Sequence, residues 1–425
     1  MSKRRWLSVV IAALFLLSFI ATGCGGGGTT PTTTAEPIKV GVPEKITGPY
    51  ASDARVSMEG ITMAIEEINA AGGVLGRPLQ MDVFDIEDMT TEKIVAASED
   101  LIIKDKVDVL LSGYAGMGPD YAVFGQYDVP FFNMDCVTSC TDLVRAGKDT
   151  NCFHLGPTDK GFAISTLPGL LDFPYGFPNN KIAFIAADFE WEVSYTQLGM
   201  APLAEQMGWD VVMKEVVPYG TTDWRAIMAK IRAMNPRPAV IHFESMYPGD
   251  TITFLQEFMK DPTDSLLYFG YVVAFPEWEN LVGADGEGLV GLGAVTPHPH
   301  SNPIGAAWAE RFQARFGHPY TFCCAANLYD AVYMWKNAVE AVGDPTKHEE
   351  INEYIRTHTY RGVCGTYAFD AGQAVPASVD FPIPVIQIQN GKPVEIFTFN
   401  VAVPGTTYEM PPYLAKARGL GNTTQ

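Results

Sequence analysis

The chain has 425 residues, of which 47% are hydrophobic and only 18% charged. A chain of this size and composition can fill a large core and form more than one lobe. Its formal net charge at pH 7 is -20. The surface therefore lacks the positive charge that phosphate recognition needs, and nucleic-acid binding is excluded as a function.

The amino terminus has the features of an exported lipoprotein. Basic residues at positions 3–5 precede an apolar run over residues 6–20, which is shorter than the ~20 apolar residues of a membrane span and typical of a signal peptide. Ala21-Thr22-Gly23-Cys24 is similar to a lipobox, although Ala21 stands where such motifs more often have leucine. We therefore predict that residues 1–23 are removed and that Cys24 carries lipid. An ordinary secretory signal is the alternative.

The segment after this cysteine is predicted to be a tether. Residues 24–36 are rich in glycine and threonine, so they cannot bury a core and favour a flexible linker. No later apolar segment is long enough to span a bilayer. The sequence thus predicts an extracytoplasmic body that a lipid anchor holds at the membrane.

The first elements of that body form a strand–helix–strand unit. Residues 38–42 and 79–84 are short β-rich runs. Between them, Met58, Ile61, Ile65 and Ile68 recur at helical spacing, and Gly72-Gly73 supplies residues that end a helix. This pattern predicts a parallel α/β sheet.

The same alternation continues along the chain. A first series ends near residue 155, and a second begins near residue 181 and closes with a hairpin through Asn390-Gly391. The predicted strands are 107–112, 129–133, 152–155, 181–187, 210–216, 239–243, 265–269, 382–388 and 395–399, with an extended segment over 288–296. The predicted helices are 91–106, 119–126, 194–207, 224–234, 247–259, 303–316 and 327–342.

Six cysteines remain after Cys24, and they fall into two groups. Adjacent cysteines are unlikely partners, so one disulfide in each group with a leftover thiol, or buried thiols alone, are both open. A zinc site is the alternative, but no C-x-x-C pair is present and no histidines stand near at metal-ligand spacing. We therefore predict no metal site. The two groups are Cys136, Cys140 and Cys152, and Cys323, Cys324 and Cys364.

Two doubly wound α/β series without a catalytic motif predict two lobes that bind a ligand at the carboxyl ends of their strands. The segment Thr47-Gly-Pro-Tyr-Ala51, with residues 58–79, resembles the branched-chain amino acid and amide group of periplasmic solute-binding proteins. The pattern extends over residues 37–400. The resemblance implies a type I periplasmic binding fold, with a hinge of three crossings.

The resemblance also implies where the lobes begin and end. The three crossings would fall near Gly156-Pro157, Thr296-Pro297 and Gly365-Thr366. Lobe 1 would comprise residues 37–157 and 298–364, and lobe 2 residues 158–297 and 365–415, with a C-terminal tail over 416–425.

The resemblance suggests ligand contacts in loops after the strands. Gly116 stands where an amino-acid binder offers a serine, and Val137 and Ser139 match a segment that offers a carbonyl and a hydroxyl. Trp191 stands where relatives carry an aromatic cover, although a core tryptophan is an equal alternative. Val272 replaces the acidic partner of an amino acid's ammonium group.

Other residues could replace that lost acid or wall the pocket. Asp53, Glu190 and Glu244 are candidate partners of an amine, against the alternative that they are solvated loop carboxylates. Aromatic walls suit an apolar or planar solute. The aromatic candidates are Tyr114, Tyr271 and Phe275, together with Trp191.

The predicted function is that of a solute-binding protein of an ABC importer, which implies a permease as partner. The solute would be branched-chain amino acid-like, an amide or an aromatic acid. A ligand-sensing subunit of a membrane receptor is one alternative, and an exported enzyme is another. G-x-S-x-G, P-loop and H-E-x-x-H motifs are absent, and His298-Pro-His300 is expected to belong to a hinge loop. No cofactor is predicted.

Overall fold

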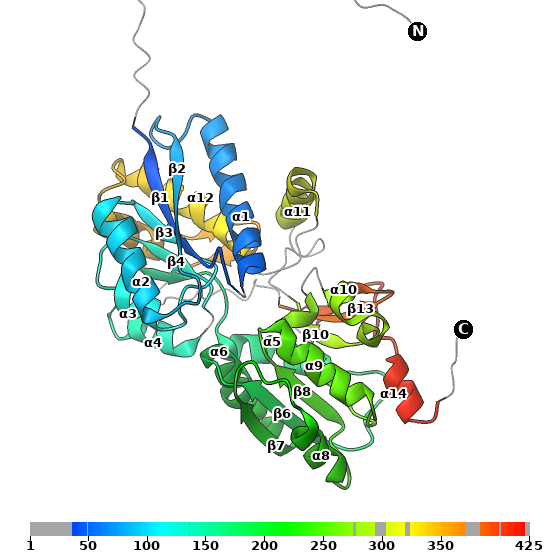
Figure 1. The fold of residues 1–425 in the computed structure, drawn as a ribbon. Helices are drawn as coiled ribbons and strands as arrows, with labels where there is room; N and C mark the ends of the chain where they lie inside the picture. Colours follow the sequence, from blue (N-terminus) through cyan, green and yellow to red (C-terminus); the bar gives the residue numbers. More distant parts are fainter. Residues whose placement is uncertain are drawn as a thin grey trace, which may run out of the picture. The chain divides into compact units, whose positions relative to one another are not determined.

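Two large β-sheets with helices packed against them make up the fold (Figure 1). The computed structural model describes residues 36–48, 50–135, 137–148, 150–274, 278–293, 303–318, 324–369, 383–398 and 401–420. Across these ranges, no helix combines the length and the apolar character that crossing a bilayer requires.

The first sheet is a five-stranded parallel sheet in the order β2-β1-β3-β4-β5. The chain enters in the middle at β1, moves to one edge and then returns across the sheet, which is a doubly wound order. β3, β4 and β5 are buried along their whole length because helices cover the sheet on its faces. The strands are β1 (Ile38–Glu44), β2 (Leu79–Asp85), β3 (Val109–Leu111), β4 (Phe131–Asn133) and β5 (Cys152–His154).

Helices from the first and the last third of the chain belong to this half. α1 (Ala51–Ala70) packs beside α12 (Ala325–Val342), although they are far apart in sequence (Figure 1). The predicted helix from Met58 is confirmed, but it begins earlier, at Ala51. The other helices are α2 (Thr91–Ala97), the π-helix η1 (Ser98–Lys104), α3 (Pro119–Phe124), α4 (Thr138–Arg145), α11 (Pro303–Phe316) and α13 (His348–Thr357).

The second sheet has eight strands in the order β15-β14-β13-β10-β9-β8-β6-β7. Its parallel half, β7-β6-β8-β9-β10, repeats the doubly wound order of the first sheet, and β13 to β15 add an antiparallel edge. The strands are β6 (Lys181–Ala187), β7 (Asp210–Val217), β8 (Val240–Glu244), β9 (Leu266–Phe269), β10 (Val290–Leu292), β13 (Pro384–Gln389), β14 (Lys392–Thr398) and β15 (Val401–Ala402).

The helices of this half include one long helix that the sequence pattern did not predict. α5 (Asp159–Leu171) contains Pro168 and is buried on most of its surface, so it lacks a one-sided apolar stripe. The helix predicted over residues 194–207 begins earlier, at Glu190. The remaining elements are α6 (Glu190–Val193), η2 (Ser194–Met200), α7 (Ala201–Gln206), α8 (Arg225–Ala233), α9 (Pro248–Met259), η3 (Tyr271–Ala274), α10 (Trp278–Val282), η4 (Gly283–Gly286) and α14 (Pro412–Ala417).

The closing hairpin is confirmed. Asn390 and Gly391 have φ angles of 53° and 72°, as a tight two-residue hairpin turn requires. A second, short hairpin pairs β11 (Tyr360–Arg361) with β12 (Thr366–Tyr367).

The chain segments that connect the two sheets can be compared with the three predicted hinge crossings. Between β5 and α5 the chain passes through Gly156-Pro157, whereas Thr296-Pro297 lies outside the described residues. At Gly365-Thr366 the chain is still in the β11–β12 hairpin. This hairpin lies against α12, because the Tyr367 hydroxyl donates to Asp330 over 3.0 Å. The lobe boundaries therefore stay predictions.

Two of the cysteines with described positions, Cys140 and Cys364, are free thiols in the core. Cys152 and Cys324 are buried as well. Cys136 and Cys323 lie outside the described residues, as does Cys24. A disulfide at Cys140 or Cys364 is therefore not observed, while pairing of Cys136 or Cys323 stays a prediction.

Candidate functional site

The candidate binding residues gather in loops at the carboxyl ends of parallel strands. In the first sheet these loops follow β1, β3 and β4, and in the second they follow β6, β7, β8 and β9. Ligands of open α/β sheets bind at this edge. The loops contain Tyr50, residues 113–118, residues 137–139, residues 188–192, Tyr219, residues 245–247 and residues 271–272.

The loop after β3 is fixed by three carboxyl groups of the chain itself. The Gly113 N–H donates to Glu44 Oε1. The Ala115 N–H donates to Asp135 Oδ1 over 3.2 Å, and the Gly118 N–H donates to Asp120 Oδ1 over 3.0 Å. These backbone donors are therefore already in use.

Gly116 lies in the middle of this loop, where a side chain does not fit without displacement. A Cβ atom at this position would lie 2.5 Å from Ile94 Cδ1 and 3.1 Å from the Asp120 nitrogen. The hydroxyl that an amino-acid binder would offer here is absent, and a side chain at this position would have to displace the Ile94 side chain and press on the backbone of Asp120.

A completely buried ion pair supports the same loop. Lys45 Nζ lies 2.8 Å from Glu44 Oε2, and both side chains have 0% exposure. The ammonium group also donates to the Tyr114 carbonyl over 2.6 Å and lies 3.4 Å from the centroid of the Tyr114 ring. A cation over an aromatic face is attracted by the ring's quadrupole. The charge of Lys45 is therefore balanced within the protein.

Asp53 and Tyr114, both predicted site residues, bind each other. The Tyr114 hydroxyl donates to Asp53 Oδ2, and the Tyr114 ring packs edge-on against Tyr50 at 6.1 Å. Burial raises the pKa of Asp53 to about 6, and the Tyr114 hydroxyl and Lys45 oppose that shift. Both side chains are almost fully buried, so their hydrogen bond stabilises the loop from the protein interior.

Asp120, Asp135 and Cys140 form a buried cluster, and one ligand atom of each lies within 4.8 Å of the others. Burial and the neighbouring Asp120 raise the pKa of Asp135 well above its ordinary value, since two close carboxylates repel each other. Asp135 and Asp120 also accept the N–H groups of Ala115 and Gly118, so the cluster helps to fix the loop after β3.

Trp191 and Tyr271, which are predicted wall residues, lie together in a buried aromatic cluster. The Trp191 ring stacks on Tyr195 at 4.8 Å and lies 5.0 Å from Tyr271 and 5.9 Å from Phe162. Trp191 is only 1% exposed, and Val272 is equally buried. All these neighbours lie in loops and helices that flank the second sheet.

Ser139 brings the two halves into contact. Its exposed hydroxyl donates to Glu190 Oε1 over 3.5 Å, and Val137 beside it is buried at the start of α4. The neighbouring Thr138 hydroxyl donates to Asp159, which also accepts the Ser194 hydroxyl. Phe275 lies outside the described residues.

Glu244 lies in the core at the end of β8. It is 0% exposed and contacts Gly270 so closely that a Cβ there would overlap its carboxyl group. Burial, followed by repulsion from Glu192, raises the pKa of Glu244 well above its ordinary value. His242 lies 3.7 Å away, and burial lowers the pKa of its imidazole to about 3. The imidazole of His242 is therefore neutral at pH 7.

The sequence interpretation missed an aromatic group in these loops. The hydroxyls of Tyr50 and Tyr219 contact each other across the two halves. The Tyr219 ring lies 5.7 Å from Phe189 and 5.8 Å from Tyr247. We call Tyr50, Phe189, Tyr219 and Tyr247 the junction aromatics. The sequence could have indicated them, because each follows soon after the end of a predicted strand.

Glu192 was also missed. Its Oε1 accepts the Met246 N–H over 3.0 Å, and the side chain is 0% exposed. Burial raises the pKa of Glu192 to about 8, although the Met246 N–H opposes the shift.

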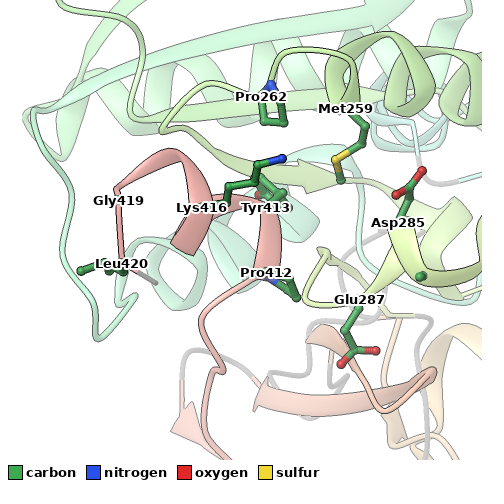
Figure 2. A pocket seen from close by; sticks show the side chains of 10 residues that line it. Met259, Pro262, Asp285, Glu287, Pro412, Tyr413, Lys416, Gly419 and Leu420 are labelled. Carbon is green, nitrogen blue, oxygen red and sulfur yellow. The ribbon is translucent and has the colours of Figure 1, made fainter. Parts of the chain in front are cut away.

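A separate pocket of about 530 Å³ lies beside α14, and its lining includes residues that precede β9 and β10 in the chain (Figure 2). Its lining includes Tyr413, whose hydroxyl accepts the N–H of Leu267 at the start of β9 over 2.8 Å. Glu287 also lines it, but its carboxylate accepts the N–H groups of Asn390 and Gly391. The described groups here hold α14 and the hairpin in place.

The comparisons with known proteins agree with this geometry. A family model described as periplasmic binding protein matches residues 37–392. The chain belongs to the periplasmic binding protein family. Its members have a fold of two α/β lobes, as described above.

Two curated relatives are similar to this chain at low sequence identity, and both are named as amino-acid-binding proteins or homologues of one. The chain is 22% identical over 337 residues to the leucine-, isoleucine-, valine-, threonine-, and alanine-binding protein of Pseudomonas aeruginosa, which covers 79% of this chain and 86% of that protein. The match to Leu/Ile/Val-binding protein homolog 8 of Brucella abortus is 25% identical and spans 57% of this chain but only 60% of the relative.

Solved structures share the fold. A chain described as a branched-chain amino acid ABC transporter from Silicibacter pomeroyi is 26% identical with a TM-score of 0.77, covering 89% of this chain and 100% of the other. A solute-binding protein from R. palustris in complex with benzoate is 18% identical with a TM-score of 0.71, covering 86% of this chain and 97% of the other. The latter likeness shows the fold alone.

Proposed function

We propose that this protein is an extracytoplasmic solute-binding protein of an ABC importer of the branched-chain amino acid and amide class. It captures a small organic solute between the carboxyl ends of its two sheets and delivers it to a permease. A lipid on Cys24 anchors it at the membrane. The single observation that carries this proposal is the contact between loops of the two sheets through Tyr50 and Tyr219 and through Ser139 and Glu190.

The relatives support transport as the role. Proteins named for branched-chain amino acid binding and ABC transport match most of the chain. Closure of two lobes around a solute is a hinge motion that such proteins use to sequester a ligand. The predicted contacts at Gly116, Val137, Ser139, Trp191, Tyr271 and Val272 belong to this proposal, as do Tyr114, Asp53 and Phe275.

The solute differs from leucine, isoleucine and valine in this proposal. Val272 offers no carboxylate to an ammonium group, and Gly116 offers no hydroxyl to a carboxylate. An uncompensated ammonium group in a closed site would cost several kcal/mol. We therefore expect weak or absent binding of these three amino acids.

Ligand identification is the decisive experiment. Protein purified gently from its native membrane should release a small solute on denaturation, detected by mass spectrometry. Adding that solute back at ~100 times its dissociation constant should stabilise the protein by about 2.7 kcal/mol, which raises the melting temperature. Chemically altered solute after incubation would instead support an enzyme. No solute and no thermal shift across a broad metabolite library would refute the binding role.

A further inference from the structure

Several backbone donors of the loop after β3 are engaged within the protein. Three of its N–H groups, at Gly113, Ala115 and Gly118, already donate to Glu44, Asp135 and Asp120. These three N–H groups are therefore not available to a solute carboxylate.

Carboxyl groups also surround the contact between Tyr50 and Tyr219. Asp250 Oδ2 accepts the Gly220 N–H over 3.1 Å and the Ser245 hydroxyl over 3.0 Å, so it is fixed beside the loop that carries Tyr219. Glu192 is fixed by the Met246 N–H. Burial raises the pKa of Tyr50 to about 12, and repulsion from Glu192, Asp53 and Asp250 adds to the shift. At pH 7 Asp53, with a pKa of about 6, is mostly ionised and makes the potential at the two hydroxyls negative, whereas Glu192, with a pKa of about 8, adds to it only when it is ionised.

The nearby cation does not offset this potential. Lys45 lowers the pKa of Asp53 and of Asp135. Its ammonium group is 0% exposed, however, and it binds the Glu44 carboxylate and the Tyr114 carbonyl. Apart from the two tyrosines themselves, the ionisable groups that act most strongly on Tyr50 and Tyr219 are carboxyl groups.

The junction aromatics supply surfaces that suit a cation. Tyr247 is 36% exposed, and Tyr219 is half-buried between Tyr247 and Phe189. Aromatic faces attract ammonium and guanidinium groups, most strongly where water is excluded.

We propose that the solute carries a positively charged amine or amidine and no carboxylate, with the charge bound at the junction aromatics under the influence of Asp250, Glu192 and Asp53. This inference rests on the proposed function and narrows the solute class. It removes aromatic acids from the candidates and keeps amine-bearing amides and organic cations. A bound cation also favours the ionised forms of the three carboxyl groups.

Identification of the co-purified solute by mass spectrometry is the first test. A solute with a basic nitrogen and no carboxylate is the expected result, and a carboxylate-bearing solute that binds and stabilises the protein would overturn the charge inference while leaving the binding role intact. If no solute is released, binding is measured by calorimetry instead. The probes are benzylamine, benzamide and benzoate, followed by a broad set of amines and acids. Binding confined to acids overturns the inference, and binding of neither class refutes the inference together with the binding role.

Variants give the second test. Asp250→Asn should weaken binding of the amine about tenfold or more, and Tyr247→Leu should do the same, while the melting temperature of the unliganded protein stays near that of the wild type. Glu205→Gln, on the exposed surface of α7, is the matched control and should leave affinity unchanged. Equal affinity of Asp250→Asn and the wild type for the amine would overturn the inference. If Asp250→Asn unfolds the protein, amine binding by the wild type is measured at increasing salt concentration instead. An affinity that does not change with salt would contradict the inference.

Discussion

The buried pair of Lys45 and Glu44 makes the sharpest prediction about the first sheet. Lys45→Met removes an ammonium group with 0% exposure and three interactions, namely Glu44 Oε2 at 2.8 Å, the Tyr114 carbonyl at 2.6 Å and the Tyr114 ring at 3.4 Å. Methionine fills a similar volume, so the main effect is a carboxylate left in the core without its partner. Breaking a buried pair in this way costs about 3–5 kcal/mol.

Thermal and urea unfolding would measure this cost. At roughly 2–4 °C for each kcal/mol in a domain of this size, the melting temperature should fall by roughly 10 °C. Glu44→Gln in the same chain removes the stranded charge, so the double variant should recover part of the loss. Lys93→Met is the control, because Lys93 pairs with Glu87 at the surface, where such pairs contribute about 0–1 kcal/mol. A Lys45→Met variant no less stable than the control would refute the reasoning, as would a double variant that loses the sum of both single changes.

Three further predictions follow from other parts of the chain. Cys24→Ala should move the protein from the membrane fraction to the soluble fraction, and unchanged membrane association would contradict the lipid anchor. Gly116→Ser should not create leucine binding and should destabilise the protein by about 1–3 kcal/mol, since its Cβ would lie 2.5 Å from Ile94 Cδ1; leucine binding by calorimetry would show this packing argument to be wrong. Glu192 has an ordinary pKa of 4.5 that burial raises to about 8 in the folded protein, so its contribution to stability is fully present below pH 4.5 and is lost as pH rises through about 8. Urea unfolding across this range should show a smaller decline in Glu192→Gln than in the wild type, and parallel pH profiles would count against the shifted pKa.

The candidate site could be predicted only in part. Ser139 and Glu190 were both named from the sequence, and the structure joins them. Asp53 was considered as an amine partner, but the Tyr114 hydroxyl binds it. Tyr219 and Glu192 were missed, because a residue after a strand end shows its partner only when the loops of other strands are in place.

The sequence by itself determined the architecture. Apolar runs of strand length, helices with apolar spacing and the turn at Asn390-Gly391 are local patterns, and each follows from the conformations of neighbouring residues. Repetition of these patterns sets the doubly wound order of both sheets, since parallel strands require crossover helices.

Tertiary structure alone decided which polar groups are free to bind a solute. Gly113 and Glu44 are 69 positions apart, and Tyr50 and Tyr219 are 169 apart, so no local pattern reveals that they meet. Burial of Glu192 and Glu244 likewise sums over many distant neighbours, and it decides whether each carboxyl group is charged. Hydrogen-bond partners and desolvation are long-range properties, and for that reason the fold was predictable from the sequence while the charge of the site was not.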